Sequence, residues 1–193
     1  MKISYVVTFY NKLEFMRALI GSIEAQIGDF DQELVLADDG SLEGEWQGLK
    51  ALVAEFPHLS IQLVDSELNT GPAQCFNRGL TAASGDVIVG IDADDVLAPY
   101  ATKHYIDQLE QLGADFIYAR RRHKTHKKAN LTGTELIEEP LTYVIKNQVV
   151  HMCFAATSTV MKGAGGADPL LFIQDQSIPL RLAYAAKKMV RSE

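Results

Sequence analysis

Strand-like and helix-like segments alternate along the first 119 residues, and this alternation constrains the fold more than any other feature. Short apolar runs predict strands at residues 3–9, 33–37, 87–91 and 115–119, and alternating apolar residues predict one at 59–64. Apolar residues recur at helical spacing between these runs, which predicts helices at residues 13–23, 46–56, 72–83 and 99–112. Such alternation is typical of an α/β fold with a mostly parallel central sheet and helices on both faces. Right-handed crossovers then bring the carboxyl ends of the strands to one edge, where ligands bind.

The pattern is weaker beyond residue 119. It predicts a helix near residues 134–146, short strands at 151–155 and 158–161, and a last helix from about residue 176. The apolar run at 170–173 has the character of one more strand. The charged segment 185–193 is expected to fray, because terminal segments are poorly ordered unless they are tied down.

Composition excludes several classes of function. The formal net charge of −7 argues against general nucleic-acid binding, so no nucleic-acid partner is expected. Cys75 and Cys153 are far apart and lack CxxC spacing, which indicates neither a zinc site nor a disulfide framework. The apolar start of the chain, at residues 3–7, is too short for a signal peptide or a membrane span. A cytoplasmic protein is therefore expected.

One basic run, residues 120–128, stands out against the acidic background. Two interpretations are open. The run is either a solvated loop or a patch for an anionic acceptor, a diphosphate or a membrane surface. The second interpretation would give the protein a peripheral contact with the inner face of the membrane.

Three carboxylates follow the predicted strand at residues 87–91. Asp92, Asp94 and Asp95 come directly after it, at the water-exposed edge of the sheet. Carboxylates this close together repel one another, and a divalent cation with oxygen ligands usually compensates them. Mg²⁺ and Mn²⁺ sites combine one or two carboxylates with substrate phosphates and water, so Asp-x-Asp indicates a phosphate-bearing substrate. The alternative is an acidic loop that caps the next helix.

A second acidic loop, Asp38-Asp39-Gly40-Ser41, ends the predicted strand at residues 33–37. In a parallel sheet it lies at the same edge as the first acidic loop, where both could face one ligand. Gly40 permits a sharp turn and Ser41 can cap the next helix, so a simple turn with a cap is the alternative.

Polar side chains also lie between the two acidic loops. Asn69, Asn77 and Arg78 could reach a nucleotide or its phosphates, and Gly79 would let its helix pack closely on a neighbour. The alternative is a loop that leads into a helix with a solvent-facing arginine.

The order of these motifs resembles that of family 2 glycosyltransferases, which have the GT-A fold. The residues that carry the resemblance are Tyr10-Asn11-Lys12, Asp38-Asp39-Gly40-Ser41, Asn69-x-Gly71, Asn77-x-Gly79, Gly85-Asp86 and Asp92-Ala93-Asp94-Asp95. A later stretch is similar to the family's Gly-Gly-Phe-Asp turn and Glu-Asp catalytic pair. It comprises Gly165-Gly166-Ala167-Asp168, Phe172-Ile173-Gln174-Asp175 and Leu180-Arg181-Leu182.

The resemblance implies a role for each matching residue. Asp92 and Asp94 would hold a divalent metal, Mn²⁺ or Mg²⁺, with Asp94 as the more direct ligand. Asp175 would be the catalytic base, whereas the alternative is that it only caps the last helix. The nucleotide would be bound by Tyr10, Asn11, Asp38, Asp39, Asn69, Asn77, Arg78 and Asp92.

The implied activity is metal-dependent sugar transfer, with inversion, from a nucleotide-diphosphate sugar to a hydroxyl acceptor. A UDP-sugar is the expected donor, and a glycan, a lipid-linked molecule or another alcohol is the expected acceptor, in surface polysaccharide assembly. One continuous domain would have a nucleotide-sugar-binding half, residues 1–119, which contains the Asp-x-Asp strand. The acceptor-side half, residues 120–193, would carry the base.

Three positions depart from the family pattern: Thr8 replaces a proline, Phe76 an arginine and Gln174 a glutamate. The last removes a charge beside Asp175, so a catalytically inactive nucleotide-binding domain is the alternative function. A sugar-nucleotide pyrophosphorylase would need a glycine-rich loop after the first strand, where this chain has Thr8-Phe9-Tyr10-Asn11. A dehalogenase-type phosphatase would place its Asp-x-Asp on the first strand, with a hydroxyl residue where this chain has Val96.

Overall fold

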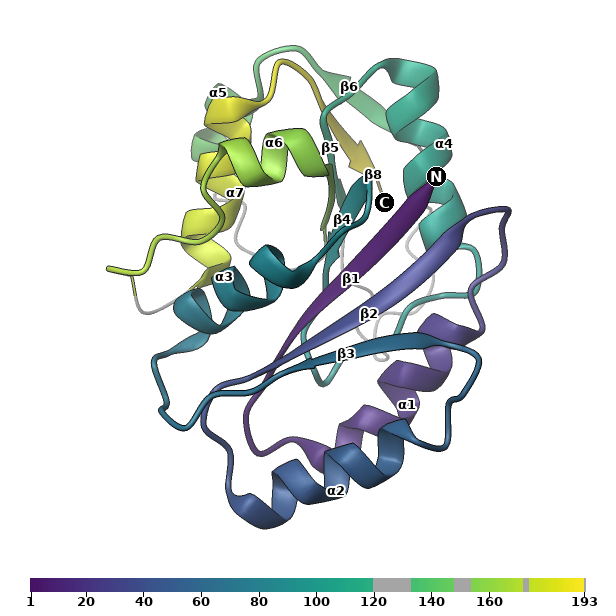
Figure 1. Ribbon diagram of the computed structural model, residues 1–193. Helices are drawn as coiled ribbons and strands as arrows, with labels where there is room; N and C mark the ends of the chain where they lie inside the picture. Colours follow the sequence, from purple (N-terminus) through teal and green to yellow (C-terminus); the bar gives the residue numbers. More distant parts are fainter. Residues whose placement is uncertain (120–132, 148–153, 172–173, 193) are drawn as a thin grey trace, which may run out of the picture.

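The computed structural model describes residues 1–119, 133–147, 154–171 and 174–192 (Figure 1). Within these ranges, eight strands form one sheet in the order β3-β2-β1-β4-β7-β5-β8-β6. In chain order the elements are β1 (Lys2–Phe9), α1 (Leu13–Glu24), β2 (Asp31–Asp38), α2 (Glu43–Val53), β3 (Ser60–Val64), α3 (Pro72–Ala82), β4 (Val87–Gly90), α4 (Ala101–Leu112), β5 (Phe116–Ala119), β6 (Glu135–Ile137), α5 (Pro140–Asn147), β7 (Phe154–Thr157), α6 (Ser158–Gly163), α7 (Gln174–Ala185) and β8 (Met189–Ser192).

The first four strands form a parallel half-sheet. β1 pairs with β2 and with β4, and β2 pairs with β3, all in parallel. The register places Phe9 opposite Asp38 and Val6 opposite Gly90. The carboxyl ends of β1, β2 and β4 therefore lie at one edge, which confirms the predicted α/β class and the predicted meeting of the two acidic loops.

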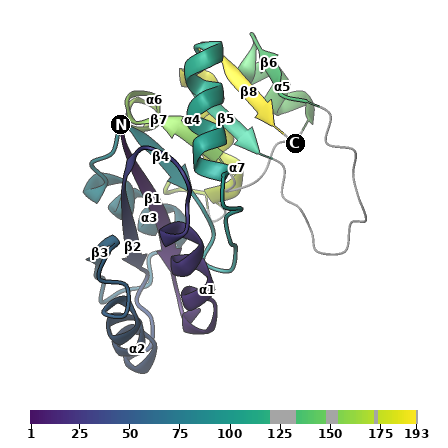
Figure 2. The same cartoon turned by 90° about the vertical axis from the view of Figure 1, so that its right-hand side faces the viewer.

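The remaining strands mix directions. β7 is antiparallel to both of its neighbours, β4 and β5. β8 runs parallel to β5, and β6 closes the order antiparallel to β8. Figure 2 shows β8 beside β6 and β5, away from the β1–β3 strands. The sheet is therefore mixed at this end, although its first half is parallel.

Two hydrophobic clusters cover the two faces of the sheet. Alternate residues of β1 supply both: Tyr5 and Val7 belong to one cluster, with side chains from α1, α2 and α4. Val6 belongs to the other, with side chains from α3, α5, α6 and α7. Figure 1 shows α1 and α2 on one side of β1–β3, and α3, α6 and α7 on the other. A Cβ atom added to Gly79 would lie 2.8 Å from Val6 Cγ1, so this glycine allows the expected close packing of α3.

Three predictions for the second half are wrong. Residues 158–161 are not a strand: they belong to α6, whose first turn is capped by the Thr157 side chain, which accepts from Val160 N at 3.4 Å. The helix predicted near 134–146 is preceded by β6 and begins only at Pro140. The strand expected at 170–173 is absent at its described positions, since Leu170 lies in an exposed turn.

The charged tail is also not frayed. Met189 and Val190 of β8 are fully buried, although charged residues flank them. Lys188 and Arg191 lie 3.7 Å from glutamates on or beside β6, Glu138 and Glu135 respectively. The burial of two apolar side chains and the pairing of their charged neighbours explain why this segment forms a strand.

The remaining predicted elements are confirmed within a few residues of their expected bounds. The strand predicted at 151–155 corresponds to β7, which begins at Phe154, while residues 151–153 lie outside the described ranges. No helix in the part of the chain that the structure describes is long and apolar enough to cross a bilayer.

Glu33 ties three segments together at the edge of the sheet opposite to the acidic loops. Its carboxylate accepts hydrogen bonds from Ser4 Oγ at 2.6 Å and Ser84 N at 2.7 Å, and pairs with Lys2 Nζ at 2.5 Å. Burial alone would raise the pKa of Glu33, but the hydrogen bonds from Lys2, Ser4 and Ser84 outweigh it and lower the pKa to about 2.

We expect Glu33→Gln to flatten the acid dependence of stability. The folded pKa of Glu33 lies below its unfolded value of about 4.3, so its contribution is complete above that value and is lost as the pH falls toward 2. The shift corresponds to about 2–3 kcal/mol. The free energy of unfolding is measured with urea at pH 5.5 and at pH 2.5. Its decrease between these two pH values should be smaller in the variant than in wild type, by about 2–3 kcal/mol. Glu24→Gln, at an exposed position, is the control; equal acid dependence in all three proteins would contradict the assignment.

Candidate functional site

Four loops meet at the carboxyl edge of the parallel strands. They comprise residues 10–12 after β1, 38–41 after β2, 69–71 before α3 and 91–95 after β4. Asp39 N donates to Phe9 O at 2.9 Å, which joins the ends of β1 and β2. Asn11 adds two bonds: its N donates to Ser41 Oγ at 3.1 Å, and its Oδ1 accepts from Leu42 N at 2.8 Å. The first two loops therefore form one surface.

Asp38 shapes the turn at the end of β2. Its buried carboxylate accepts from the backbone N of Gly40 and of Ser41, both at 3.1 Å. Gly40 has a φ of +74°, and a Cβ there would lie 2.6 Å from Asn69 N. Only glycine therefore fits this turn. The predicted cap from Ser41 is wrong, because α2 has no side-chain cap and Ser41 Oγ accepts from Asn11 instead.

Asp39 is the centre of a buried polar network. Its Oδ1 accepts from Thr70 N at 2.9 Å and Thr70 Oγ1 at 3.1 Å, and its Oδ2 accepts from Gly71 N at 3.0 Å. Arg78 Nη2 completes the set, 3.2 Å from Oδ1, and also donates to Asp38 O at 2.9 Å. Because this charge is only 4% exposed, its pairing with Arg78 and the loop amides holds the 69–71 loop against the strand end.

The Asp-x-Asp loop presents its side chains beside this network. Asp95 N donates to Asp92 O at 3.0 Å, which makes a turn directly after β4. Ala93 is buried, whereas Asp94 is exposed. Lys12 Nζ, from the end of β1, lies 2.9 Å from Asp94 Oδ2. The structure therefore brings the loops after β1 and β4 together through a charged contact.

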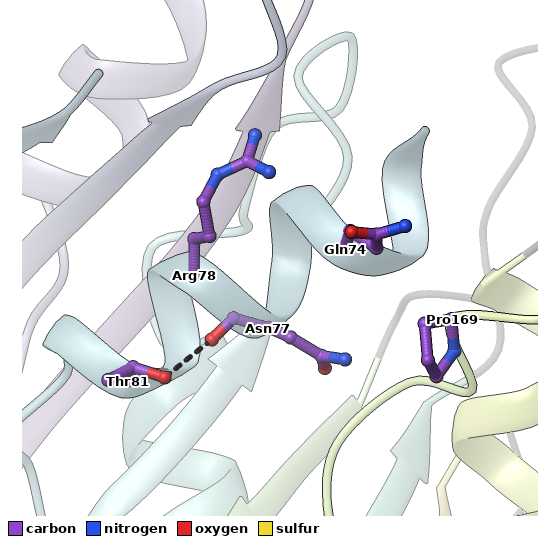
Figure 3. Close-up of a pocket in the computed structure, with 5 residues that line it drawn as sticks. All are labelled: Gln74, Asn77, Arg78, Thr81 and Pro169. Carbon is purple, nitrogen blue, oxygen red and sulfur yellow. Dashed lines mark hydrogen bonds between the residues drawn. The ribbon is translucent and has the colours of Figure 1, made fainter. Parts of the chain in front are cut away.

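The remaining predicted nucleotide residues divide between two places. Tyr10 is 48% exposed at the same edge, and exposed Asn69 accepts from Gly71 N at 3.2 Å. Asn77 faces the other way: its Nδ2 donates to Ala167 O and its Oδ1 accepts from Ala167 N, both at 2.8 Å. Figure 3 shows the Asn77 amide directed toward Pro169, while the Arg78 guanidinium points away from it. Asn77 therefore joins α3 to the turn after α6.

That turn is in contact with α7. Asp168 N donates to Ser177 Oγ at 3.0 Å, and Arg181 Nε donates to Ala164 O at 2.9 Å. Gly166 has a φ of +66°, and a Cβ there would overlap the Asn77 side chain. Sequence reasoning assigned Asn77 to the ligand and missed this two-bond contact. The signal was the paired glycines, because two successive residues with positive φ allow a turn to approach another side chain closely.

Asp175 lies in the first turn of α7. Its side chain falls outside the described part of the structure, as do the basic residues 120–128. The predicted base and the predicted anionic patch therefore stay predictions.

Two cavities in the described part of the structure are lined by residues outside the acidic loops, although Arg78, which lines the first, also pairs with Asp39. One, of about 350 Å³, is lined by Gln74, Asn77, Arg78, Thr81 and Pro169 (Figure 3). The other, of about 540 Å³, lies among α5, α6 and α7. Neither is lined by Tyr10, Asp39, Asp92 or Asp94. We place the candidate site at the strand edge, because ligands of open α/β sheets bind outside the carboxyl ends of the strands.

Phe76, one of the three departures from the resemblance, has a structural explanation. Its side chain is fully buried in the cluster around α3, and its ring packs edge-on against Phe154, with the centroids 6.3 Å apart. An arginine in this orientation would be buried without a partner, which is strongly unfavourable. In this chain the guanidinium that pairs with Asp39 comes from Arg78.

Relatives by sequence include two bacterial proteins. An uncharacterised glycosyltransferase of Nostoc is 29% identical over 165 residues, which cover 82% of this chain and 49% of the relative. An amylovoran biosynthesis glycosyltransferase of Erwinia amylovora is 26% identical over 190 residues, which cover 93% of this chain and 68% of the relative. The chain thus spans about half of the length of the first of these relatives.

Solved structures share the fold at low sequence identity. Staphylococcus aureus TarS in complex with UDP-GlcNAc superposes with a TM-score of 0.81 at 20% identity, over 99% of this chain and 56% of that one. A mannosyltransferase of Pyrobaculum calidifontis in complex with GDP-Man and Mn²⁺ superposes with a TM-score of 0.68 at 18% identity, over 90% and 49%. The fold is therefore that of GT-A enzymes, as the resemblance implied.

The family description "Glycosyl transferase family 2" matches residues 4–164, which contain all four loops of the candidate edge. The match covers well over half of the 193 residues. Together with the strand-edge loops and the fold, it shows that this chain belongs to glycosyl transferase family 2.

Proposed function

We propose that this chain transfers a sugar, with inversion, from a nucleotide-diphosphate donor to a hydroxyl acceptor. The observation that carries the proposal is the arrangement of two acidic loops at one strand edge, with the Asp39–Arg78 network on one side and Asp94 on the other. Sugar transfer needs both parts, because a nucleoside must be held and a diphosphate must be stabilised as it leaves.

The nucleoside is proposed to bind against the loops after β1 and β2. The Tyr10 ring is exposed at this edge and offers an apolar face to a base. The carboxylates of Asp38 and Asp39 are already engaged by backbone N–H groups. They hold the loop rigid, so that the exposed side chains of Asn11 and Asn69 are presented to base and ribose. Pre-organisation of this kind reduces the entropy lost when a ligand is bound.

A divalent metal fits the acidic loop by its chemistry. Asp92 and Asp94 offer hard carboxylate oxygens, which suit Mn²⁺ and Mg²⁺. Within the described residues no group of three or more His, Cys, Asp or Glu side chains is placed to hold a metal by itself. The protein would thus supply one or two ligands, and substrate phosphates and water the rest. When bound, the metal neutralises charge that develops on the leaving diphosphate.

Asp175 is proposed as the base that takes the proton of the acceptor hydroxyl. Attack from the side opposite to the leaving diphosphate inverts the anomeric centre. The contacts of Asn77 with Ala167, and of Ser177 with Asp168, link α3 to the helix that carries Asp175. They join the proposed donor half, residues 1–119, to the proposed acceptor half, residues 120–193, within one domain.

The donor and acceptor classes follow from relatives. TarS binds UDP-GlcNAc and the Pyrobaculum enzyme binds GDP-Man with Mn²⁺. We propose a UDP-sugar as the donor, and a glycan or lipid-linked alcohol as the acceptor. The amylovoran relative supports a role in polysaccharide assembly.

Calorimetric titration with UDP, GDP and dTDP, each with and without Mn²⁺, tests the donor side of the proposal. We expect UDP to bind most tightly, and Mn²⁺ to strengthen its binding more than about tenfold. Binding of none of the three would contradict the proposed function. Binding without any transfer to glycan or lipid-linked acceptors would favour the alternative, an inactive nucleotide-binding domain. The uncharged Gln174 beside Asp175 is the reason for considering this alternative.

A further inference from the structure

Lys12 occupies an unusual place in the site. It is the N-cap residue of α1, yet α1 has no side-chain cap there. A lysine at this end of a helix is unfavourable, because it cannot accept a hydrogen bond from the free N–H groups and because the helix dipole is positive there. Helix stability therefore does not explain Lys12. Its ammonium is directed at the Asp-x-Asp loop instead, 2.9 Å from Asp94 Oδ2.

The backbone around Lys12 is fixed. Asn11 has a φ of +50°, in the left-handed region, and is held by its two bonds to the 41–42 segment. Leu13 N donates to Glu45 Oε2 at 2.9 Å, and Lys12 O accepts from Phe15 N at 3.1 Å. Both neighbours of Lys12 are thus anchored to α2 or to the loop before it. The ammonium is presented to Asp94 from a rigid base, although its own stem of four methylenes can move.

The Lys12 contact and a bound metal compete for the same carboxylate. A Mn²⁺ or Mg²⁺ ion binds a carboxylate oxygen at about 2.0–2.2 Å. An ammonium at hydrogen-bond distance from that oxygen occupies the same region and repels the ion. Charge repulsion between the two cations therefore weakens the Lys12 contact when a metal binds Asp94. The flexible stem of Lys12 would let the ammonium turn toward a diphosphate bound at the same metal.

We infer that Lys12 is an exchangeable counter-cation, which pairs with Asp94 before the donor binds and with the donor diphosphate afterwards. This inference rests on the proposed function. It makes metal binding depend on the nucleotide: without a diphosphate, the ammonium competes with the metal, and with one, both cations have an anionic partner. Asp94 thereby has a cationic partner in both states.

Two titrations on three variants test the inference. Mn²⁺ alone is titrated into the nucleotide-free protein and followed by the electron paramagnetic resonance of free Mn²⁺. One nucleoside diphosphate is then titrated in saturating Mn²⁺ by calorimetry. It is whichever of UDP, GDP and dTDP binds wild type most tightly. Lys12→Met removes the charge, and Lys12→Arg keeps it. Lys103→Met is the matched control, because it breaks another exposed ion pair, Lys103–Asp107, on α4.

The inference predicts effects of opposite sign for Lys12→Met. Its nucleotide-free form should bind Mn²⁺ about two- to fivefold more tightly, as expected when an exposed ion pair is removed. Its affinity for the nucleoside diphosphate in Mn²⁺ should fall about three- to tenfold, as a charged hydrogen-bond donor is lost. Lys12→Arg and Lys103→Met should stay within about twofold of wild type in both titrations.

Unchanged or weaker Mn²⁺ binding by Lys12→Met, or unchanged diphosphate binding, would overturn the inference while leaving the proposed function intact. If wild type bound none of the three nucleoside diphosphates, the proposed function would fail and the inference with it. Nucleoside diphosphate binding by wild type distinguishes the two failures, because it is lost only if the proposed function is wrong.

Discussion

Asp175→Asn is expected to reduce sugar transfer by a factor of about 10²–10⁴, the usual effect of removing a general base. Donor and metal binding should be unchanged, because the base acts from the acceptor side. The rate is measured as release of the nucleoside diphosphate, with a donor and an acceptor on which wild type is active. Calorimetry with the donor nucleotide and Mn²⁺ provides the binding comparison.

The competing explanation is that Asp175 only caps α7. Asparagine caps a helix nearly as well as aspartate, so this role predicts a loss of stability of at most about 1 kcal/mol and no loss of transfer. Asp29→Asn, at an exposed position before β2, is the matched control for loss of one carboxylate. If Asp175→Asn transferred sugar at the wild-type rate, Asp175 would not be the catalytic base.

Asp94→Ala is expected to abolish the effect of Mn²⁺ on nucleotide binding. Loss even of an outer-shell partner weakens metal binding about 10–100-fold, so loss of a ligand should weaken it at least tenfold. The fold should be preserved, since Asp94 is exposed in the turn after β4. Titration of UDP with and without Mn²⁺ gives the result, and the variant should bind UDP equally under both conditions.

Asp107→Ala is the matched control for Asp94→Ala. Asp107 also forms an exposed ion pair with a lysine, 2.5 Å from Lys103 Nζ, but lies on α4. Its replacement should leave the Mn²⁺ effect at its wild-type size. If Asp94→Ala kept a Mn²⁺ effect of that size, the metal would bind elsewhere.

The parallel half of the fold could be predicted because its signals are local. β1, β2 and β4 contain short apolar runs, β3 alternates, and each intervening helix has apolar residues on one face. The position of the acidic loops follows from this alternation alone, because parallel strands end at a common edge. The registers of β1 with β2 and β4 confirm that edge.

The second half could not be predicted because its determinants are not local. Residues 158–161 have the β-branched content of a strand. They form the start of a helix instead, which the Thr157 side chain caps and whose Met161 side chain is buried. β8 is short and flanked by charges, and it forms because β5 and β6 offer edges on both sides. The Thr157 cap is local, but the pairing of β8 with β5 and β6 is not visible in a window of sequence.

The site shows the same division. Glycine and aspartate in Asp38-Asp39-Gly40-Ser41 predict a turn, and the structure contains it. The sequence does not indicate that Asp39 accepts from residues 70 and 71, or that Lys12 reaches Asp94, because these partners are 31 to 82 residues apart. Such pairs depend on how loops meet once the sheet has formed.

The strand order has a consequence for synthesis on the ribosome. Among the strands that the structure describes, β6 pairs with β8 alone, yet more than 50 residues separate Ile137 from Met189. β1, β2 and β3 can pair as soon as they emerge, whereas β6 has no partner strand until residue 189 leaves the exit tunnel. Domains generally fold from the amino-terminal side during translation. Nascent chains halted at the end of α7, once β6 has left the tunnel and before β8 is made, should therefore protect β1–β3 from proteolysis while β6 remains cleavable.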